Sequence, residues 1–428
     1  MTEKITILGV PIDKLTEAQA IDRIDQFVQS VRPHQIVTVN AEFLVAAQKD
    51  SSFRETLYQS SLNTADGIGV LWAAKYLSLP SVKMKYFHGL TVLYQLLSSA
   101  LAVALRPRHI RSVIPEKISG TDLIWSLAGL AESRGYSIFL LGGFGDTPRR
   151  VANALGKKFP RLKIAGVYSG SPTEEGIVER VNKTGADILL VAFGPVRQDL
   201  WISKNLKKLT ASVCMGLGGT FDYIAGNKAL APNFLRYRGL EWAFRLITQP
   251  KRLFRIINAV PVFCYMVYRA KLLQDRPFRK NVVGCLLNGE GQILVCRRKD
   301  PEPDFGTGEH WQLPQGGIQE GETLDAAFKR EIFEETGVSS LEVLGYLPDA
   351  YRYDWPVQLA DEMYSSKYRG QSQSIFYAKV GLGQNIKLDD REFDAYRWVN
   401  KEEIVSAIHP FRKDLAYLIL NNFDRFVK

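Results

Sequence analysis

Residues 316–338 constrain the fold of this chain more than any other segment. They run Gly-Gly-Ile-Gln-Glu-Gly-Glu-Thr-Leu-Asp-Ala-Ala-Phe-Lys-Arg-Glu-Ile-Phe-Glu-Glu-Thr-Gly-Val. Apolar residues recur in it at helical spacing and form one stripe, namely Leu324, Ala327, Phe328 and Ile332. Gly337 stands where a glycine that ends a helix is expected. The segment therefore predicts a glycine-containing loop followed by one amphipathic helix.

Three glutamates fall on one side of this predicted helix. Glu331, Glu334 and Glu335 stand at positions i, i+3 and i+4, where like charges cost a helix about 0.2–0.5 kcal/mol per pair. Arg330 offsets part of this repulsion. A row of carboxylate oxygens beside a glycine loop suits a hard divalent ion, Mg²⁺ or Mn²⁺, together with a substrate diphosphate. The three glutamates alone would instead indicate a solvated acidic helix face.

All nine fixed positions of the pattern G-x5-E-x7-R-E-U-x-E-E-x-G-U, with U aliphatic, are present. The segment therefore resembles the Nudix box of metal-dependent pyrophosphohydrolases. The flanking sequences 311–317, 351–356 and 392–399 resemble the branch with diadenosine-polyphosphate hydrolases and RNA 5′-pyrophosphohydrolases. The resemblance implies three groups of residues: catalytic Glu334, Glu335 and Arg330; metal ligands Glu331, Glu334, Glu335 and Glu392; and substrate contacts Arg279 and Tyr353.

One departure from that branch concerns the substrate. Ser372 and Ser374 stand where RNA pyrophosphohydrolases tend to carry lysines. A groove for a polyanionic RNA chain would need those positive charges. The substitution favours a small dinucleotide or nucleotide-sugar substrate over nucleic acid.

Length and charge indicate two domains. The 428 residues suit two domains better than one, and we expect them at 1–275 and 276–428. Residues 281–428 hold 17 Lys and Arg against 24 Asp and Glu, a net charge of −7, whereas residues 1–280 carry +17. Such a basic domain seeks phosphate in a nucleotide, an anionic lipid or nucleic acid. Nucleic acid is disfavoured because no aromatic-basic sheet motif or recognition-helix pattern accompanies the charge.

The cysteines and the N-terminus indicate a cytosolic protein. The four cysteines stand singly in apolar surroundings without C-x-x-C spacing, which indicates reduced core residues rather than zinc or disulfides. The first residues lack the apolar run of a signal peptide.

The N-terminal two thirds alternate apolar runs with amphipathic helical stretches. The runs are Ile5–Val10, Gln35–Val39, Ser137–Leu141, Lys163–Val167, Asp187–Phe193 and Ala211–Met215. This alternation predicts an α/β domain with a doubly wound, mostly parallel sheet. Ligands of such sheets bind at the carboxyl ends of the strands. We expect the C-terminal domain to be an α/β/α sandwich with a mixed sheet, as the Nudix resemblance implies.

Polar or glycine-rich residues follow five of the predicted strands. They are Thr38 with Asn40, Asp66, Gly142–Gly145, Phe193–Asp199 and Gly216–Asp222. Gly142 and Gly143 precede a predicted helix start with proline at 148, where backbone N–H groups favour a phosphate. Taken singly, a glycine cluster is more often a tight turn, and an aspartate before glycine is more often a turn cap. Five such strand ends together predict a binding edge.

These segments resemble the WecG/TagA/CpsF family of bacterial glycosyltransferases. The matching blocks are 7–13, 39–40, 65–69, 119–123, 218–232 and 239–246. The resemblance implies transfer of an N-acetylmannosamine-type sugar from a UDP donor to a polyprenyl-diphosphate-linked acceptor, at the cytoplasmic membrane face and without a metal. It assigns Asp66 as the general base, Thr38 and Asn40 to the same pocket, and Gln198 to the donor. Pro195 and Asp199 depart from the family's usual G-x-P-x-Q-E order.

Two basic, apolar stretches, 83–111 and 242–271, suit helices lying in the surface of an anionic membrane. The apolar run 90–105 is shorter than the roughly 20 residues of a typical span. A buried helical hairpin or a contact in a homo-oligomer is the competing interpretation. Arg236, Arg238 and Arg245 are candidates for the membrane and for the donor diphosphate.

The sequence predicts a bifunctional enzyme, peripheral at the inner membrane face, that joins a UDP-sugar-dependent transferase to a Nudix hydrolase acting on a nucleotide substrate. In a second interpretation only the Nudix domain is catalytic and the first domain docks on a membrane or regulates. In a third, the acidic domain merely binds nucleotide and docks on the basic one.

Overall fold

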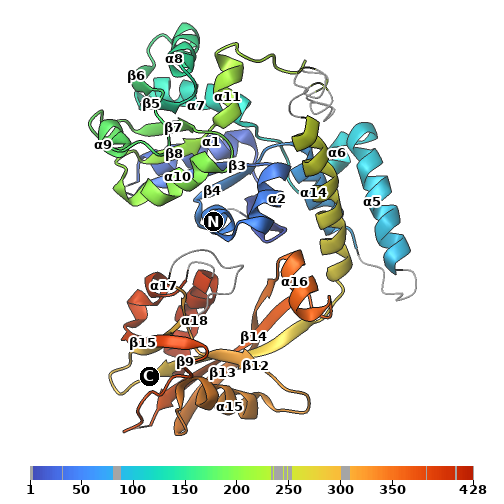
Figure 1. The fold of residues 1–428 in the computed structure, drawn as a ribbon, viewed down its shortest axis with the longest axis vertical. Coiled ribbons are helices and arrows are strands. Elements are labelled where there is room, and N and C mark those ends of the chain that lie inside the picture. The colour runs from blue at the N-terminus through green and yellow to red at the C-terminus, as the bar shows by residue number, and fades with distance from the viewer. Residues whose placement is uncertain are drawn as a thin grey trace. The chain divides into compact units, whose positions relative to one another are not determined.

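The computed structural model describes residues 3–30, 32–80, 88–232, 235, 244, 248, 253–299, 309–381, 383–409 and 412–427. The chain divides into two compact units, Met1–Leu272 and Leu273–Lys428. Each unit has its own sheet (Figure 1).

The first unit is built on a six-stranded sheet whose neighbouring strands are all parallel. In sheet order the strands are β4 (Leu62–Ala65), β3 (His34–Val39), β8 (Val213–Gly216), β7 (Ile188–Ala192), β5 (Ser137–Gly142) and β6 (Lys163–Tyr168). Alternate residues of β5 enter different cores: Ile138 and Leu140 pack on one face, Phe139 and Leu141 on the other. Helices therefore cover both faces, which confirms the doubly wound α/β fold.

Most helices of this unit pack on the two faces of the sheet, and some lie at its flank. They are α1 (Glu17–Val28), α2 (Ala41–Lys49), α3 (Ser51–Gln59), α4 (Ile68–Ser78), α5 (His88–Leu105), α6 (Pro107–Ile110), α7 (Gly120–Arg134), α8 (Thr147–Lys158), α9 (Ile177–Asn182), α10 (Arg197–Asn205), η1 (Leu206–Lys208), α11 (Gly218–Ile224) and α14 (Leu253–Leu273). By length and composition, α5 is the one described helix that could cross a membrane, and 11% of it is buried.

The first apolar run departs from the prediction. Ile5–Val10 is interrupted at Leu8 and Gly9, where φ is +50° and +78°. The chain turns back there, and β1 (Lys4–Ile7) pairs antiparallel with β2 (Val10–Asp13) in a separate two-stranded sheet. The run was therefore wrongly expected to be a strand of the parallel sheet.

The second unit is built on a seven-stranded mixed sheet. Its strands are β9 (Phe278–Leu287), β10 (Ile293–Arg298), β11 (Trp311–Gln312), β12 (Gln315–Gly317), β13 (Leu341–Asp354), β14 (Gly370–Val380) and β15 (Phe393–Val399). β14 runs parallel to β9, and the other pairs are antiparallel. The helices are α15 (Leu324–Thr336), α16 (Val357–Tyr364), η3 (Lys401–Glu403), α17 (Ile404–Ala407) and α18 (Lys413–Phe426).

Helices cover both faces of this mixed sheet. Phe328 and Ile332 of α15 pack with Phe376 of the sheet. Ile419 of α18 packs with Tyr377 on the opposite face. This is the predicted α/β/α sandwich, and it fixes α15 against the sheet by its apolar stripe.

Candidate functional site

Helix α15 has the predicted start and end. The Thr323 side chain accepts from the Ala326 N–H at 3.2 Å and caps the first turn. Gly337 adopts φ +70° just beyond the last turn, a conformation that favours glycine. The three glutamates therefore project from one rigid helix.

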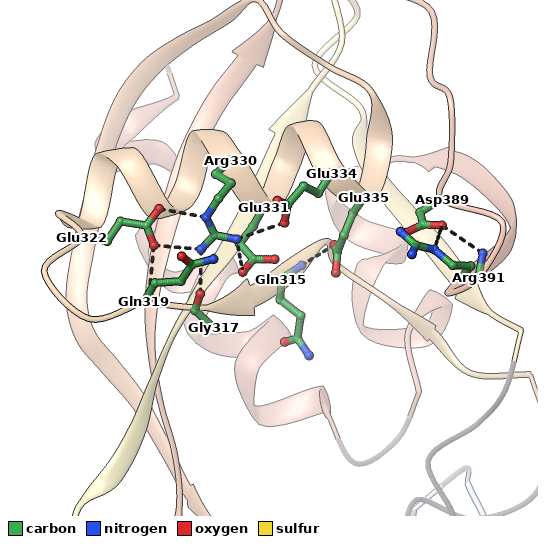
Figure 2. A network of polar contacts seen from close by, with 10 residues as sticks. All are labelled: Gln315, Gly317, Gln319, Glu322, Arg330, Glu331, Glu334, Glu335, Asp389 and Arg391. Atoms are coloured by element: carbon green, nitrogen blue, oxygen red, sulfur yellow. Dashed lines mark hydrogen bonds and ion pairs between the residues drawn. The ribbon is translucent and has the colours of Figure 1, made fainter.

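Arg330 binds four groups at once (Figure 2). Its guanidinium donates to both oxygens of Glu322 at 2.9 and 2.8 Å and to the Gly317 carbonyl at 2.9 Å. It also donates to Glu331 at 2.7 Å and to Glu334 at 3.0 Å. Bidentate contact with Arg330 lowers the pKa of Glu322 to about 2. Glu322 is a fixed position of the box that the sequence prediction did not include among the site residues.

The three helix carboxylates differ in exposure. The Glu334 side chain is 55% exposed and that of Glu331 is 14% exposed. Glu335 is buried and accepts from the Gln315 N–H at 2.8 Å. Burial raises the pKa of Glu331 and Glu335, and the charge of Glu392 raises both further. The structure thus brings Glu392, from the loop before β15, close to the helix glutamates.

These acids fit a hard divalent ion. Among the described residues, no three Asp, Glu, His or Cys side chains already surround one point as ligands. Arg330 binds Glu331 and Glu334, and the Gln315 N–H binds Glu335. Buried carboxylates that raise one another's pKa would be stabilised by a cation. Glu331, Glu334, Glu335 and Glu392 would be the oxygen donors for it, which stays a prediction from the Nudix resemblance.

Two glycines let side chains approach the backbone before α15. A Cβ on Gly316 would lie 1.8 Å from Glu331 Oε2, and one on Gly317 would lie 2.3 Å from an Arg279 guanidinium nitrogen. A side chain at either position would force the Glu331 carboxylate or the Arg279 guanidinium to move. Arg279 therefore lies beside the box, near the carbonyl that Arg330 binds, and its contact with substrate stays a prediction.

Tyr353 and the two serines lie on β13 and β14. The Tyr353 hydroxyl donates to Gln371 Oε1. Between Leu347 and Tyr351 the strand bulges, so that residues 348–350 face the single residue Ser374.

The two serines bind this bulge. The Ser372 hydroxyl donates to Asp349 Oδ1 at 2.8 Å and accepts from Arg352 Nε at 3.2 Å. Ser374 Oγ accepts from the Asp349 N–H at 3.1 Å, and Asp349 has φ +45°. Both serines are buried. The two positions where RNA pyrophosphohydrolases tend to carry lysines thus hold buried serines that stabilise the bulge.

In the first unit, Thr38, Asn40 and Asp66 lie at adjacent strand ends. Thr38 pairs in register with Thr64, and the Asp66 N–H donates to the Val39 carbonyl at 2.7 Å. The Asn40 side chain accepts from the Phe43 N–H at 3.0 Å and caps α2. These three predicted residues are therefore brought together.

The start of α7 lies next to the ends of β3 and β4. The Ile118 N–H donates to the Ala65 carbonyl at 2.9 Å. A Cβ on Gly120 would lie 3.0 Å from the Thr220 hydroxyl oxygen and 3.8 Å from that of Thr38. Gly120 and Thr220, in segments that matched the family blocks, were not predicted as site residues.

Gln198 ties α10 to the end of β8. Its carbonyl oxygen accepts from the Gly218 N–H at 2.8 Å, and the side chain is buried. A Cβ on Gly216 would lie 2.7 Å from Gln198 Nε2 and 2.5 Å from Asp199 Oδ1. Asp199 is fully buried, and burial raises its pKa to about 7.

Gly142 and Gly143 end β5, three strands from β3 in the sheet. They adopt φ +88° and +82°, and the Gly143 N–H donates to the Ala192 carbonyl at 2.9 Å. Three strand spacings correspond to about 14 Å. The predicted arginines Arg236, Arg238 and Arg245 lie outside the described residues.

Known proteins match both units. The model of the glycosyl transferase WecG/TagA/CpsF family matches residues 5–105 and 96–277, and the NUDIX domain model matches 277–421. An N-acetylglucosaminyldiphosphoundecaprenol N-acetyl-beta-D-mannosaminyltransferase of Staphylococcus aureus is 27% identical over 273 residues, which is 63% of this chain and 94% of the relative. An RNA pyrophosphohydrolase of Gluconacetobacter diazotrophicus is 36% identical over 159 residues, which is 36% of this chain and 95% of the relative.

Two solved structures are similar to this chain. The MutT protein of Methanosarcina mazei is 21% identical with a TM-score of 0.26, over 35% of this chain and 96% of that one. An Ap4A hydrolase of C. elegans is 18% identical with a TM-score of 0.27, over 35% of this chain and 97% of that one. From the two family matches, the chain belongs to the WecG/TagA/CpsF glycosyl transferase family and carries a C-terminal NUDIX domain.

Proposed function

We propose that the protein is bifunctional. Its first unit transfers an N-acetylmannosaminyl-type sugar from a UDP-sugar to a polyprenyl-diphosphate-linked acceptor in the synthesis of a surface polysaccharide or a teichoic-acid linkage. The main support for this proposal is that Thr38, Asn40 and Asp66 lie together at the carboxyl ends of the adjacent strands β3 and β4. The named S. aureus transferase, similar over almost its whole length, supports it.

In the proposed transfer reaction, Asp66 is the general base. Its carboxylate accepts the proton of the acceptor hydroxyl while that oxygen bonds to the anomeric carbon of the donor. The bond from this carbon to the UDP oxygen breaks, and UDP leaves with the electron pair. The Gly143 N–H is already bound to the Ala192 carbonyl, so the start of α8 that follows Gly142–Gly145 is the place that suits the donor phosphates.

The second unit hydrolyses a nucleoside-diphosphate-linked substrate. Glu331, Glu334, Glu335 and Glu392 would hold Mg²⁺ or Mn²⁺, which supplies charge neutralisation for a diphosphate. Arg330 keeps Glu331 and Glu334 in position through its contacts with both. Water adds to one phosphorus, the bridging P–O bond breaks, and the substrate separates into two phosphate-bearing products.

Two variants test the two activities, and each is the control for the other. Asp66→Asn should abolish sugar transfer to a polyprenyl-diphosphate acceptor and leave nucleotide hydrolysis unchanged. Glu334→Gln/Glu335→Gln should do the reverse. Full transfer by Asp66→Asn would discard Asp66 as the base. Wild-type protein without transfer would favour a docking or regulatory first unit.

A second candidate substrate of the Nudix unit is the 5′-pyrophosphate of RNA. The 36% identity with the G. diazotrophicus RNA pyrophosphohydrolase favours it. The buried Ser372 and Ser374, in place of lysines, favour a small substrate. A screen with Mg²⁺ against UDP-sugars, dinucleotide polyphosphates and triphosphorylated RNA decides between them. Wild-type protein that binds nucleotide without hydrolysis would reduce this unit to a binding module.

A further inference from the structure

Helix α5 carries a stripe of exposed apolar side chains. Large apolar residues 43–71% exposed recur along it at i, i+3, i+4, i+7, i+11 and i+15, namely Leu90, Leu93, Tyr94, Leu97, Leu101 and Leu105. At 100° per residue these positions fall within about 120° of the helix circumference. A contiguous apolar surface of this kind marks an interaction site.

The opposite side of α5 is the side that packs on its own domain. Its buried residues are Val92 and Ser99, which lie about 180° from the middle of the apolar stripe. Trp72 of α4 donates to Ser99 Oγ at 3.0 Å, and the Tyr76 hydroxyl of α4 donates to the Val92 carbonyl at 3.0 Å. In Figure 1, α5 runs along the outer flank of the unit, away from the six-stranded sheet. The apolar stripe is therefore turned outward.

The positive charge around the apolar stripe indicates what kind of surface it binds. Residues 67–115 contain no Asp or Glu and six Lys or Arg. Arg106 and Arg108 are exposed directly beyond the last turn of α5. Apolar side chains next to a purely basic segment complement a surface that is apolar inside and anionic at its rim, and an anionic lipid bilayer is such a surface.

The packing of α5 decides how it meets the bilayer. Val92 and Ser99 contact Tyr76 and Trp72 respectively, so α5 runs antiparallel to α4 and along it. The chain then re-enters the domain core at Ile110, which is fully buried. A helix that crossed the bilayer once would leave its two ends on opposite sides. Both ends of α5 instead adjoin one compact unit.

We propose that α5 is a monotopic anchor that lies in the plane of an anionic bilayer, with the stripe Leu90–Leu105 in the acyl region and Arg106 and Arg108 at the headgroups. The anchor rests on exposure and charge and is independent of sugar transfer. α4, which supports it, begins at Ile68, two residues after Asp66. The anchor is thus built on the helix that follows the proposed base.

Co-sedimentation of the full-length protein with vesicles tests the anchor. Wild type should bind vesicles containing phosphatidylglycerol more tightly than pure phosphatidylcholine vesicles. Leu97→Glu/Leu101→Glu should lower the partition coefficient at least about a hundredfold, since each leucine contributes roughly tenfold or more. The control is Tyr417→Glu, an exposed apolar position, at 53%, in the second unit. Arg106→Gln/Arg108→Gln should remove the preference for the anionic lipid.

The mass in solution and the depth of insertion complete the test. Tyr94→Trp should be quenched by brominated acyl chains, which places the stripe at acyl depth. Equal vesicle binding by wild type and Leu97→Glu/Leu101→Glu would overturn the anchor. So would a wild-type dimer that this variant converts to a monomer with vesicle binding unchanged, because the stripe would then cover a second copy of the chain. Circular dichroism, and hydrogen exchange in peptides from β7 and β8, confirm that the first unit of each variant is folded.

Discussion

The buried carboxyl group of Asp199 should make the first unit less stable as the pH rises. Asp199 is fully buried, and the Gln198 side chain and its own backbone only partly offset the cost of a buried charge there. Burial raises its pKa from an ordinary 3.8 to about 7. Between these values the folded protein keeps a proton that the unfolded chain releases.

The sign and size follow from proton linkage. Because the folded state binds the extra proton, the free energy of unfolding falls as the pH rises from about 4 to about 7, and it levels off above that. A rise from 3.8 to about 7 corresponds to about 4 kcal/mol. Asp199→Asn removes the charge and keeps the shape, so its stability relative to wild type should increase by about this amount across the window.

Urea unfolding at about pH 4, pH 6 and pH 8 measures the difference, with hydrogen exchange in peptides from β7 and β8 reporting the first unit alone. Asp22→Asn, at an exposed position of α1, is the matched control for the loss of one carboxylate. The reasoning is refuted if Asp199→Asn differs from wild type by a constant amount, because the buried carboxyl would then not be held neutral.

Two further predictions concern the second unit. Gly316→Ala places a methyl group 1.8 Å from Glu331 Oε2 and should lower nucleotide hydrolysis by about tenfold or more while sugar transfer is kept; Gly289→Ala, with no atom within 4 Å of its added Cβ, is the control, and equal activity of the two would contradict the close approach. Burial lowers the pKa of His409 from 6.5 to about 3, so the stability of this unit should fall by up to about 5 kcal/mol as the pH drops through that range. His409→Gln should flatten the profile in acid unfolding followed by peptides from α18, and an unchanged slope would exclude His409 as its source.

The parallel sheet was predictable where strands are apolar on both faces. β7 is a continuous apolar run because helices cover both of its sides. β4 was missing from the predicted apolar runs because Asn63 and Thr64 interrupt its apolar character, although Asp66 was placed at a strand end. The Asn63 amide donates to the Pro11 and Leu57 carbonyls at 2.9 and 2.6 Å, and such long-range partners cannot be read from the local sequence.

The candidate sites were predictable to the extent that they are local. Glu331, Glu334 and Glu335 share one helix, so their spacing was enough to group them. The bidentate contact between Arg330 and Glu322 could not be predicted in this way, because it depends on how the loop before α15 folds back onto the helix. Gly120 meets Thr38 and Thr220 only through packing between distant segments. The sequence contained these residues but no periodic pattern that joined them.

The bulge at Asp349 limits how this Nudix unit could change its substrate in evolution. Ser372 and Ser374 both hold Asp349, whose backbone has a left-handed φ. A lysine in place of Ser372 would remove the hydroxyl that donates to Asp349. Its charged ammonium group would also have to move out of a buried position. Single substitutions toward a lysine-bearing groove therefore pass through a less stable intermediate, and the effects of neighbouring changes would be non-additive. The proposed preference for a small substrate is therefore tied to this bulge, and we expect no single substitution to reverse it without a loss of stability.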